Sequence, residues 1–280
     1  MNTNRTFSPA VTEKADAPYE NQIDNYFQNH YQLFFNKQIN QQWKWNTALF
    51  YTKGRGYYEE YKAGVDFNDY NIDVSNKPNV PSDLVRRRWL DNDFYGQIAA
   101  ITYQDNFNEL TFGGGWSKYD GLHFGTLPYL SNDLAPKNFK YYDNDAVKSE
   151  NNLYAKWDRK LNSKAKSFID LQVRNVQHTM NGFTKNTDLN IQRSFTFFNP
   201  KAGITYTLNQ ASSIYGYFGI ANKEPRRDDY ESVCGGTSPI YENHSKWGLG
   251  YNLGFNKKED YTAEEVTVDV NFGYLHDAGT

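Results

Sequence analysis

The chain has almost no cysteine, no long apolar run and no excess of positive charge. Its single cysteine, Cys234, excludes an intramolecular disulfide and leaves too few thiols for a zinc finger. No apolar run approaches the roughly 20 residues that a membrane-spanning helix needs. A formal net charge of -3 and a pI of about 6.0 give no basic footprint for nucleic acid. A disulfide scaffold, a helical membrane protein and a nucleic-acid partner are therefore not expected.

Aromatic residues, in contrast, are abundant on a polar background. The 280 residues include 23 Tyr, 19 Phe and 6 Trp, although the mean hydropathy is only -0.85. Aromatic side chains are favoured in β-strands, where they pack on a half-buried surface. This composition suits strands whose two faces meet different solvents.

The clearest strand pair lies between residues 201 and 220. Apolar or aromatic side chains recur at every second position, with the two-residue period of a strand. They are Ala202, Ile204, Tyr206 and Leu208 in the first half. A polar turn at 209–213 separates this half from a second alternating stretch, which ends in a charged, proline-containing segment at 222–230. The unit is a strand, a tight turn, a second strand and a charged loop.

The same alternation predicts about ten strands, joined by connections that are alternately short and long. Short turns are predicted at 36–41, 105–108, 162–165 and 209–213, and long loops at 54–87, 126–147 and 178–193. This rhythm is typical of an outer-membrane β-barrel. We therefore predict an all-β fold, an antiparallel transmembrane β-barrel segment in the outer membrane of a Gram-negative cell. A soluble β-sandwich or propeller also alternates but needs no such rhythm.

The β-barrel prediction assigns sides and faces to particular residues. The turns that contain Asn106 and Ser163 are expected to be periplasmic, and the loops that contain Asn79 and Asn186 extracellular. Alternation places the side chains of Leu171 and Val268 toward lipid and those of Arg174 and Asp269 toward the lumen.

Six stretches of the chain resemble TonB-dependent outer-membrane receptors of the Bacteroidetes type. They occur in order at 26–33, 54–59, 87–96, 113–125, 198–203 and 224–230. The resemblance implies an importer with a barrel of about 22 strands, filled by an N-terminal plug and driven by the TonB complex. It also implies a ligand that is a siderophore, vitamin, haem or glycan.

Both ends of the chain depart from that resemblance. No plug, TonB-contact segment or signal peptide is recognisable, and the sequence after Tyr230 leaves the family pattern. The expected organisation is a loop at 1–21, receptor strands and extracellular loops at 22–231, and divergent barrel strands at 232–280. We expect an internal piece of the wall that forms an open, curved sheet. Its expected partners are outer-membrane lipid, the plug of the same receptor, the TonB complex and a small-molecule or glycan ligand.

Charged residues crowd the end of one predicted strand: Glu224, Arg226, Arg227 and Asp228. The functional hypothesis is a patch in the lumen that contacts the plug or the ligand. The alternative is a set of local ion pairs, which contribute little where they are exposed.

Aromatic residues near the predicted loop–strand junctions form a second candidate group, comprising Tyr57, Tyr58, Trp89 and Tyr119. They could stack on a ligand or form an interfacial aromatic girdle. The basic run 86–88 at the foot of the first long loop could attract an anionic ferric chelate, or it could be a solvated rim.

Residues for catalysis or metal binding are not evident. The five histidines share no close ligand spacing, and Asp120 with His123 lacks a nucleophile motif or a second carboxylate. The run 113–115 of three glycines has no following helix, so it indicates a bend or a close backbone approach rather than a phosphate loop. We expect no enzyme, metal or cofactor. A ten-stranded outer-membrane barrel hydrolase is the first alternative, and a soluble β-rich binding module the second.

Overall fold

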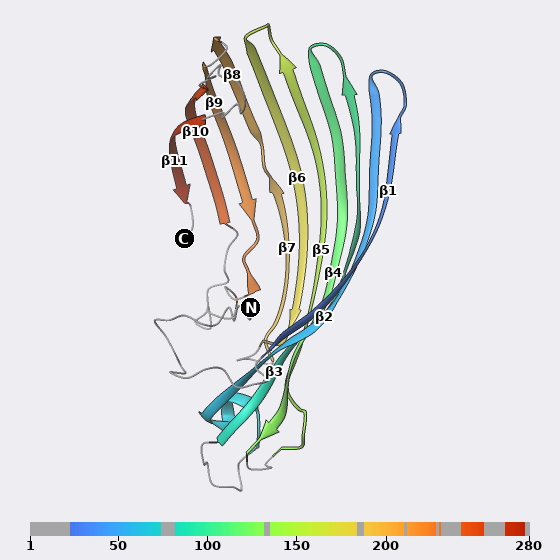
Figure 1. Cartoon of the computed structure of the whole chain (residues 1–280), viewed down its shortest axis with the longest axis vertical. Coiled ribbons are helices and arrows are strands. Elements are labelled where there is room, and N and C mark those ends of the chain that lie inside the picture. The colour runs from blue at the N-terminus through green and yellow to red at the C-terminus, as the bar shows by residue number, and fades with distance from the viewer. Residues whose placement is uncertain are drawn as a thin grey trace, which may run out of the picture.

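In the computed structural model, the described residues are 23–73, 82–131, 135–183, 188–209, 212–227, 230, 242–254 and 267–277, the last two ranges as backbone only. Across these residues, eleven strands form one curved antiparallel sheet (Figure 1). The elements are β1 (Asp24–Gln38), β2 (Trp43–Val65), the 3-10 helix η1 (Phe67–Tyr70), β3 (Ser82–Gln104), β4 (Asn108–Leu130), β5 (Phe139–Lys160), β6 (Ala165–Asn181), β7 (Asn190–Phe198), β8 (Lys201–Asn209), β9 (Ser212–Lys223), β10 (Glu242–Gly254) and β11 (Thr267–Asp277). Within this part of the chain, no helix is long and apolar enough to cross a membrane.

Strands that are consecutive in the sequence pair in the sheet, except that β7 and β8 both pair with β6. The order is β1-β2-β3-β4-β5-β6-β8-β9-β10-β11, and β7 pairs with β6 beside this path. β6 pairs with β8 along its first part and with β7 along its last part. The ladder is interrupted at Asn199 and Pro200, although the backbone there still bonds Gln172 of β6 and Ile220 of β9. β1 and β11 are the two ends of the order. The predicted open, curved sheet of about ten strands is thereby confirmed.

The strands are staggered, so that rows of paired residues climb across the sheet. One row starts at Trp43, the first residue of β2, and continues through Tyr103, Leu110 and Trp157. It reaches Ile169 of β6, which already lies four residues beyond the start of that strand at Ala165. Such a stagger accompanies strands that are tilted in a curved barrel wall.

Three short turns at one end of the sheet share a single device. The side-chain Oδ1 of Asn40, Asp105 and Asn162 each accepts two backbone N–H hydrogen bonds from residues two and three positions further on, at 2.7 to 2.9 Å. These are Asx turns, and they close connections of three or four residues. The predicted turns at 105–108 and 162–165 are confirmed, and the first turn lies at 39–42.

At the other end of the sheet, the strands are longer than predicted. The loop predicted at 54–87 is wrong over much of its length, because β2 continues to Val65 and β3 begins at Ser82. β4 and β5 likewise extend into the loop predicted at 126–147. At the loop predicted at 178–193, β6 continues to Asn181 and an additional strand, β7, begins at Asn190. The physical reason is that residues 54–62 carry glycine, charged and aromatic side chains on both faces. The alternation of apolar and polar residues therefore stops although the strand does not.

Alternate residues divide the sheet into two faces. We call outer the face that carries large apolar side chains near the short turns: Trp45, Ile101, Phe112, Ala155 and Leu171 occupy one paired row on it. The opposite, inner face carries Glu150 and Arg174. Leu171 and Arg174 therefore lie on opposite faces, as predicted. The side chains of Val268 and Asp269, and all of Asn79 and Asn186, lie outside the described residues.

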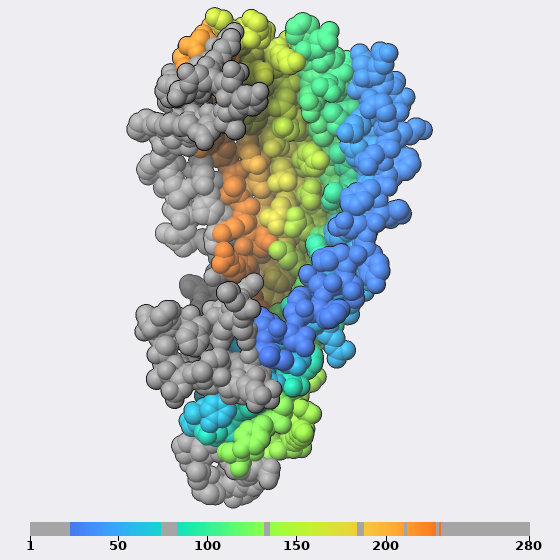
Figure 2. Space-filling model, viewed as in Figure 1, coloured from blue at the N-terminus to red at the C-terminus, as the bar shows by residue number. Residues whose placement is uncertain are grey.

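Segments from the long-loop end fold over the inner face and bury apolar side chains there. η1 contributes Phe67 and Tyr70 to a cluster with Tyr142 of β5. Phe183 and Tyr230 cover Met180 of β6 in a second cluster. The inner face is thus the concave one, and Figure 2 shows the hollow that it encloses.

Candidate functional site

Four charged side chains join β5, β6 and the end of β9 on the inner face. Arg174 of β6 donates two hydrogen bonds to Glu150 of β5, Nε to Oε1 at 2.7 Å and Nη2 to Oε2 at 2.8 Å. Its Nη1 lies 3.1 Å from Oε2 of Glu224, and Nζ of Lys148 also bonds Glu224. The side chains of Arg174 and Glu224 are 19% and 10% exposed. We call these four residues the inner ion network; its two cations and two carboxylates balance.

Glu224 is ionised in this setting. Burial acts to raise the pKa of its carboxyl, but the hydrogen bond from Lys148, together with the charges of Lys148 and Arg174, holds the pKa below the usual range for glutamate. The carboxylate is therefore a fixed anion at neutral pH, and it links a segment that follows β9 to strands β5 and β6.

The other members of the predicted charge cluster are placed differently. Arg227 turns away: its Nη2 donates to the carbonyl of Gly182 at 2.5 Å, and its guanidinium lies 4.6 Å from the centroid of the Phe183 ring. Arg226 is exposed, and Asp228 lies outside the described residues. The structure thus separates Glu224 from Arg227, although they are close in sequence. The partners of Glu224 at Lys148 and Arg174 were missed by sequence reasoning, because they are distant along the chain.

The four candidate aromatic residues lie within strands rather than at loop junctions, and they divide between the faces. Tyr57 and Trp89 form a pair on the outer face, next to the pair of Arg55 with Asp91. Tyr58 and Tyr119 lie on the inner face. The junction prediction is wrong because β2, β3 and β4 extend past these positions. Only Tyr58 and Tyr119 can meet a molecule inside the hollow.

On the outer face, Tyr57 and Trp89 belong to a ladder of rings. The ring centroids of Tyr57 and Trp89 are 4.5 Å apart, and those of Trp89 and Phe124 are 5.6 Å apart with nearly parallel planes. The guanidinium of Arg87 lies 4.4 Å from the Tyr57 centroid, and that of Arg55 lies 5.8 Å from the Trp89 centroid. Stacked rings and cation–π contacts stabilise the sheet here from outside.

The basic run 86–88 is part of β3 and also alternates between the faces. Arg87 is on the outer face, where its Nε donates to Glu59 at 2.5 Å. Arg86 is on the inner face, where it donates to Glu60 and, at 3.2 Å, to the hydroxyl of Tyr70. Arg88 also lies on the inner face, and its buried Nε has no hydrogen-bond partner among the described residues. Of the three arginines, Arg88 is thus the one whose Nε is not bonded to a carboxylate of β2.

The remaining candidates for chemistry do not come together. Asp120 is on the outer face and His123 on the inner face, so the two cannot form an acid–base pair; His123 instead lies 3.4 Å from the hydroxyl of Tyr119. The described residues contain no group of three side chains that could hold a metal ion. The glycine run at 113–115 does mark a close approach, since a Cβ atom on Gly114 would lie 2.4 Å from the carbonyl oxygen of Asn152.

Comparisons with known proteins show the fold. No family model and no curated protein matches the sequence. The solved structure titled copper transporter OprC matches with a TM-score of 0.65 at 13% identity, over 83% of this chain and 37% of that one. The ferric-catecholate import receptor Fiu of E. coli K12 matches at 0.63 and 10%, over 82% and 38%. The siderophore receptor PiuA of Acinetobacter baumannii matches at 0.56 and 13%, over 84% and 39%.

The chain spans less than two fifths of the length of each of these three structures. At such low identities the likeness concerns the fold alone. The chain has the fold of one segment of a larger β-barrel, in agreement with the open order of its strands.

Proposed function

We propose that this chain is part of the wall of a TonB-dependent receptor in the outer membrane of a Gram-negative bacterium, and that the receptor imports a siderophore, vitamin, haem or glycan ligand. The observation that carries the proposal is the pairing of an apolar outer face with a charged inner face on an open, staggered sheet. The resemblance over residues 20–231 and the shared fold with a copper transporter and two receptors support it.

An unclosed sheet in a membrane requires further strands of the same receptor to pair with its two end strands. Each end strand, β1 and β11, presents a row of backbone donors and acceptors that lipid cannot satisfy. We propose that further strands pair there to close the barrel, and that the plug fills the hollow. The inner ion network then acts within the wall, holding β5 and β6 to the segment after β9. Arg226, which is exposed, is the proposed contact for the plug.

For the ligand, we propose the inner-face group of Arg88, Tyr58 and Tyr119. Arg88 offers a buried Nε–H donor directly opposite the ring of Tyr58. Tyr119 offers a second ring on the same face, about 20 Å nearer the short turns. A guanidinium favours an anionic or strongly polar ligand group. This assignment replaces the hypothesis from the sequence that Tyr57 and Trp89 stack on a ligand, because both side chains lie on the outer face of the sheet.

The two alternative functions have less support. A barrel hydrolase would need its acid and base on one face, whereas Asp120 and His123 lie on opposite faces. A soluble binding module would have to expose Trp45, Phe112 and Leu171 to water, because these side chains are 41%, 50% and 42% exposed on one continuous face. Such a large exposed apolar patch is unusual for a soluble protein.

The proposal is tested by uptake in cells that carry the full-length protein or its deletion. Iron- or vitamin-limited cells receive labelled siderophores, cobalamin, haem and oligosaccharides, with and without TonB. The expected result is uptake of one ligand that requires both the protein and TonB. The control is Trp89→Ala, which alters the outer face only and should retain uptake. If every ligand enters equally without the protein or without TonB, import is not its function.

A further inference from the structure

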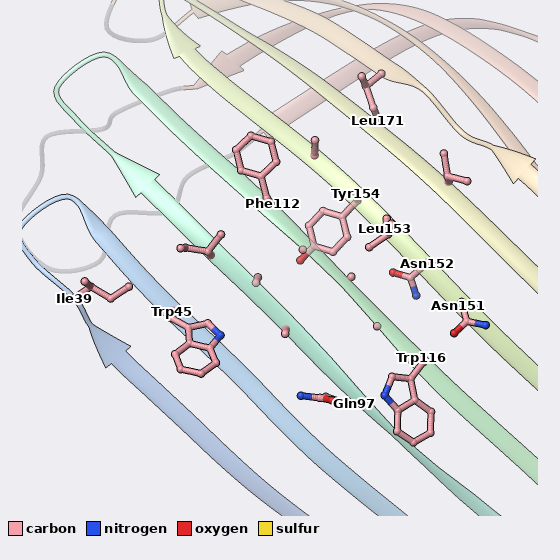
Figure 3. A pocket seen from close by; sticks show the side chains of 18 residues that line it. Ile39, Trp45, Gln97, Phe112, Trp116, Asn151, Asn152, Leu153, Tyr154 and Leu171 are labelled. Carbon is pink, nitrogen blue, oxygen red and sulfur yellow. The ribbon is translucent and has the colours of Figure 1, made fainter.

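The outer face contains one broad apolar hollow. It has a volume of about 1130 Å³ and lies across β2 to β6, between Trp45 on one side and Leu171 on the other. Figure 3 shows Trp45, Phe112, Leu153 and Trp116 around it. Leu153 is 73% exposed, so the hollow opens toward the surroundings of the sheet and not toward its interior.

The floor of the hollow consists largely of backbone. Ala99 pairs with Gly114 on the outer face, and both sit between taller rows. Ile101 and Phe112 form the row nearer the short turns, and Gln97 and Trp116 form the row nearer the long loops. On β3 and β4 this middle row carries no side chain larger than a methyl group, and this creates the depression. Thr47 on β2 and Leu153 on β5 belong to the same row and bound it.

The two ends of the hollow differ in polarity. Toward the short turns its lining is apolar, with Ile39, Trp45 and Phe112. Toward the long loops the lining includes the side-chain amides of Gln97 and Asn151. Lys118 follows two residues beyond Trp116 on the same face, about 7 Å further along the strand, and no ion pair engages it among the described residues. A cation thus stands just past the polar end.

The difference in polarity between the two ends of the hollow matches the apolar chain and polar headgroup of a single lipid molecule. An apolar depression that faces hydrocarbon forfeits dispersion contacts unless methylene groups fill it, and its apolar lining disfavours water. Amide groups and an ammonium at one end suit the ester and phosphate oxygens of a headgroup. The apolar end suits the acyl chain.

We propose that the hollow is a binding site for a single lipid of the outer leaflet that carries a negatively charged phosphate headgroup. Its acyl chain lies over Ala99 and Gly114, and its phosphate lies beside Lys118. The inference rests on the proposed function, because it requires this face to lie in a membrane with the long loops outside.

The test uses quenching of tryptophan fluorescence. Because the chain holds four further tryptophans, the signal of Trp45 and Trp116, which line the hollow, is taken as the difference from a Trp45→Phe, Trp116→Phe variant. The full-length receptor is placed in vesicles of phosphatidylcholine that contain a few per cent of brominated phosphatidylglycerol or, separately, brominated phosphatidylcholine. We expect the phosphatidylglycerol probe to be about fivefold more effective, the factor that one Lys near an anionic headgroup contributes. Ala99→Phe, which fills the hollow, and Lys118→Gln should each abolish this preference. Ala202→Phe, an equal change on the outer face away from the hollow, should leave it intact.

Two failures have different meanings. Vesicles made entirely of brominated phosphatidylcholine should quench the receptor strongly; if they do not, the outer face is not in lipid and the proposed function itself is wrong. If they do quench, but the two dilute probes act equally in the wild type, or the preference survives Ala99→Phe, the face meets only bulk lipid and the lipid site is refuted.

Discussion

The inner and outer faces are built from the same strands, yet their side chains are stabilised in different ways. Along β6, Leu171 and Val173 point outward into an apolar row, while Gln172 and Arg174 point inward to hydrogen-bonding partners. Outer-face residues near the short turns need only an apolar medium, whereas inner-face residues need particular partners. A substitution should therefore be judged by its face before its chemistry.

The largest effect is expected from a charge on the outer face. Leu171→Arg places a guanidinium toward hydrocarbon and should cost about 2–4 kcal/mol of barrel stability. Gln172→Arg, one residue along on the inner face, should cost little. Heat-modifiability of the assembled receptor on gels measures the folded fraction of each variant. Equal loss in the two variants would remove the distinction between the faces.

The inner face should respond most to the loss of Arg174. Arg174→Met leaves Glu150 and Glu224 without their shared partner, and we expect a loss of about 2 kcal/mol, below the range for fully buried pairs because the site is partly exposed. Lys156→Met is the matched control, since the Lys156–Asp158 pair is 47% and 42% exposed and should matter far less. Denaturant titration of both variants gives the comparison. A second variant, Arg174→Met with Glu150→Gln, should recover part of the loss.

Two aromatic residues on adjacent strands but opposite faces, Tyr58 and Trp89, should respond differently to substitution. Tyr58→Ala should weaken ligand binding about fivefold, as expected for one aromatic contact of about 1 kcal/mol, because Tyr58 faces the space enclosed by the inner face. Trp89→Ala should leave ligand affinity unchanged and lower only stability, because Trp89 belongs to the outer ladder. Equilibrium binding of the imported ligand to both purified variants measures this. A larger affinity loss for Trp89→Ala would place the ligand on the wrong face.

The smallest effect on stability is expected from lowering the pH, through the ionisation of Glu224. The pKa of Glu224 is lowered in the folded state, so its ionised form contributes stability above the unfolded value of about 4.3. That contribution is lost as the pH falls below this value through the folded pKa. The stability difference between wild type and Glu224→Gln should therefore shrink between about pH 5 and pH 3. Melting temperatures across this range test the sign; a difference that grows on acidification would contradict it.

Sequence reasoning succeeded where local chemistry determines structure. Asp105 and Asn162 close their turns with their own side chains, so turns at these positions follow from the residue type. The alternation of residues 169–174 likewise shows which side chains share a face. The open sheet follows from a strand count well below the number in the resembled family.

The failures have two physical origins. Toward the long loops both faces mix charged and aromatic side chains, as in residues 54–62, and periodicity then no longer distinguishes a strand from a loop. Without that signal, Tyr57 and Tyr58 fall into one candidate group, although consecutive strand residues must point to opposite faces. The partners of Glu224 depend on which strands lie side by side, and no local signal in the sequence reports that.

The central claim is that this chain is an open segment of a larger wall, and disulfide trapping in the full-length receptor tests it most directly. Tyr31→Cys combined with Tyr51→Cys is the positive control, because these residues are opposite each other in β1 and β2 with ring centroids 5.9 Å apart. Tyr31→Cys combined with Val270→Cys joins the two end strands. We predict an efficient cross-link in the first pair and none in the second. An efficient cross-link between positions 31 and 270 would show a small closed barrel and contradict the account.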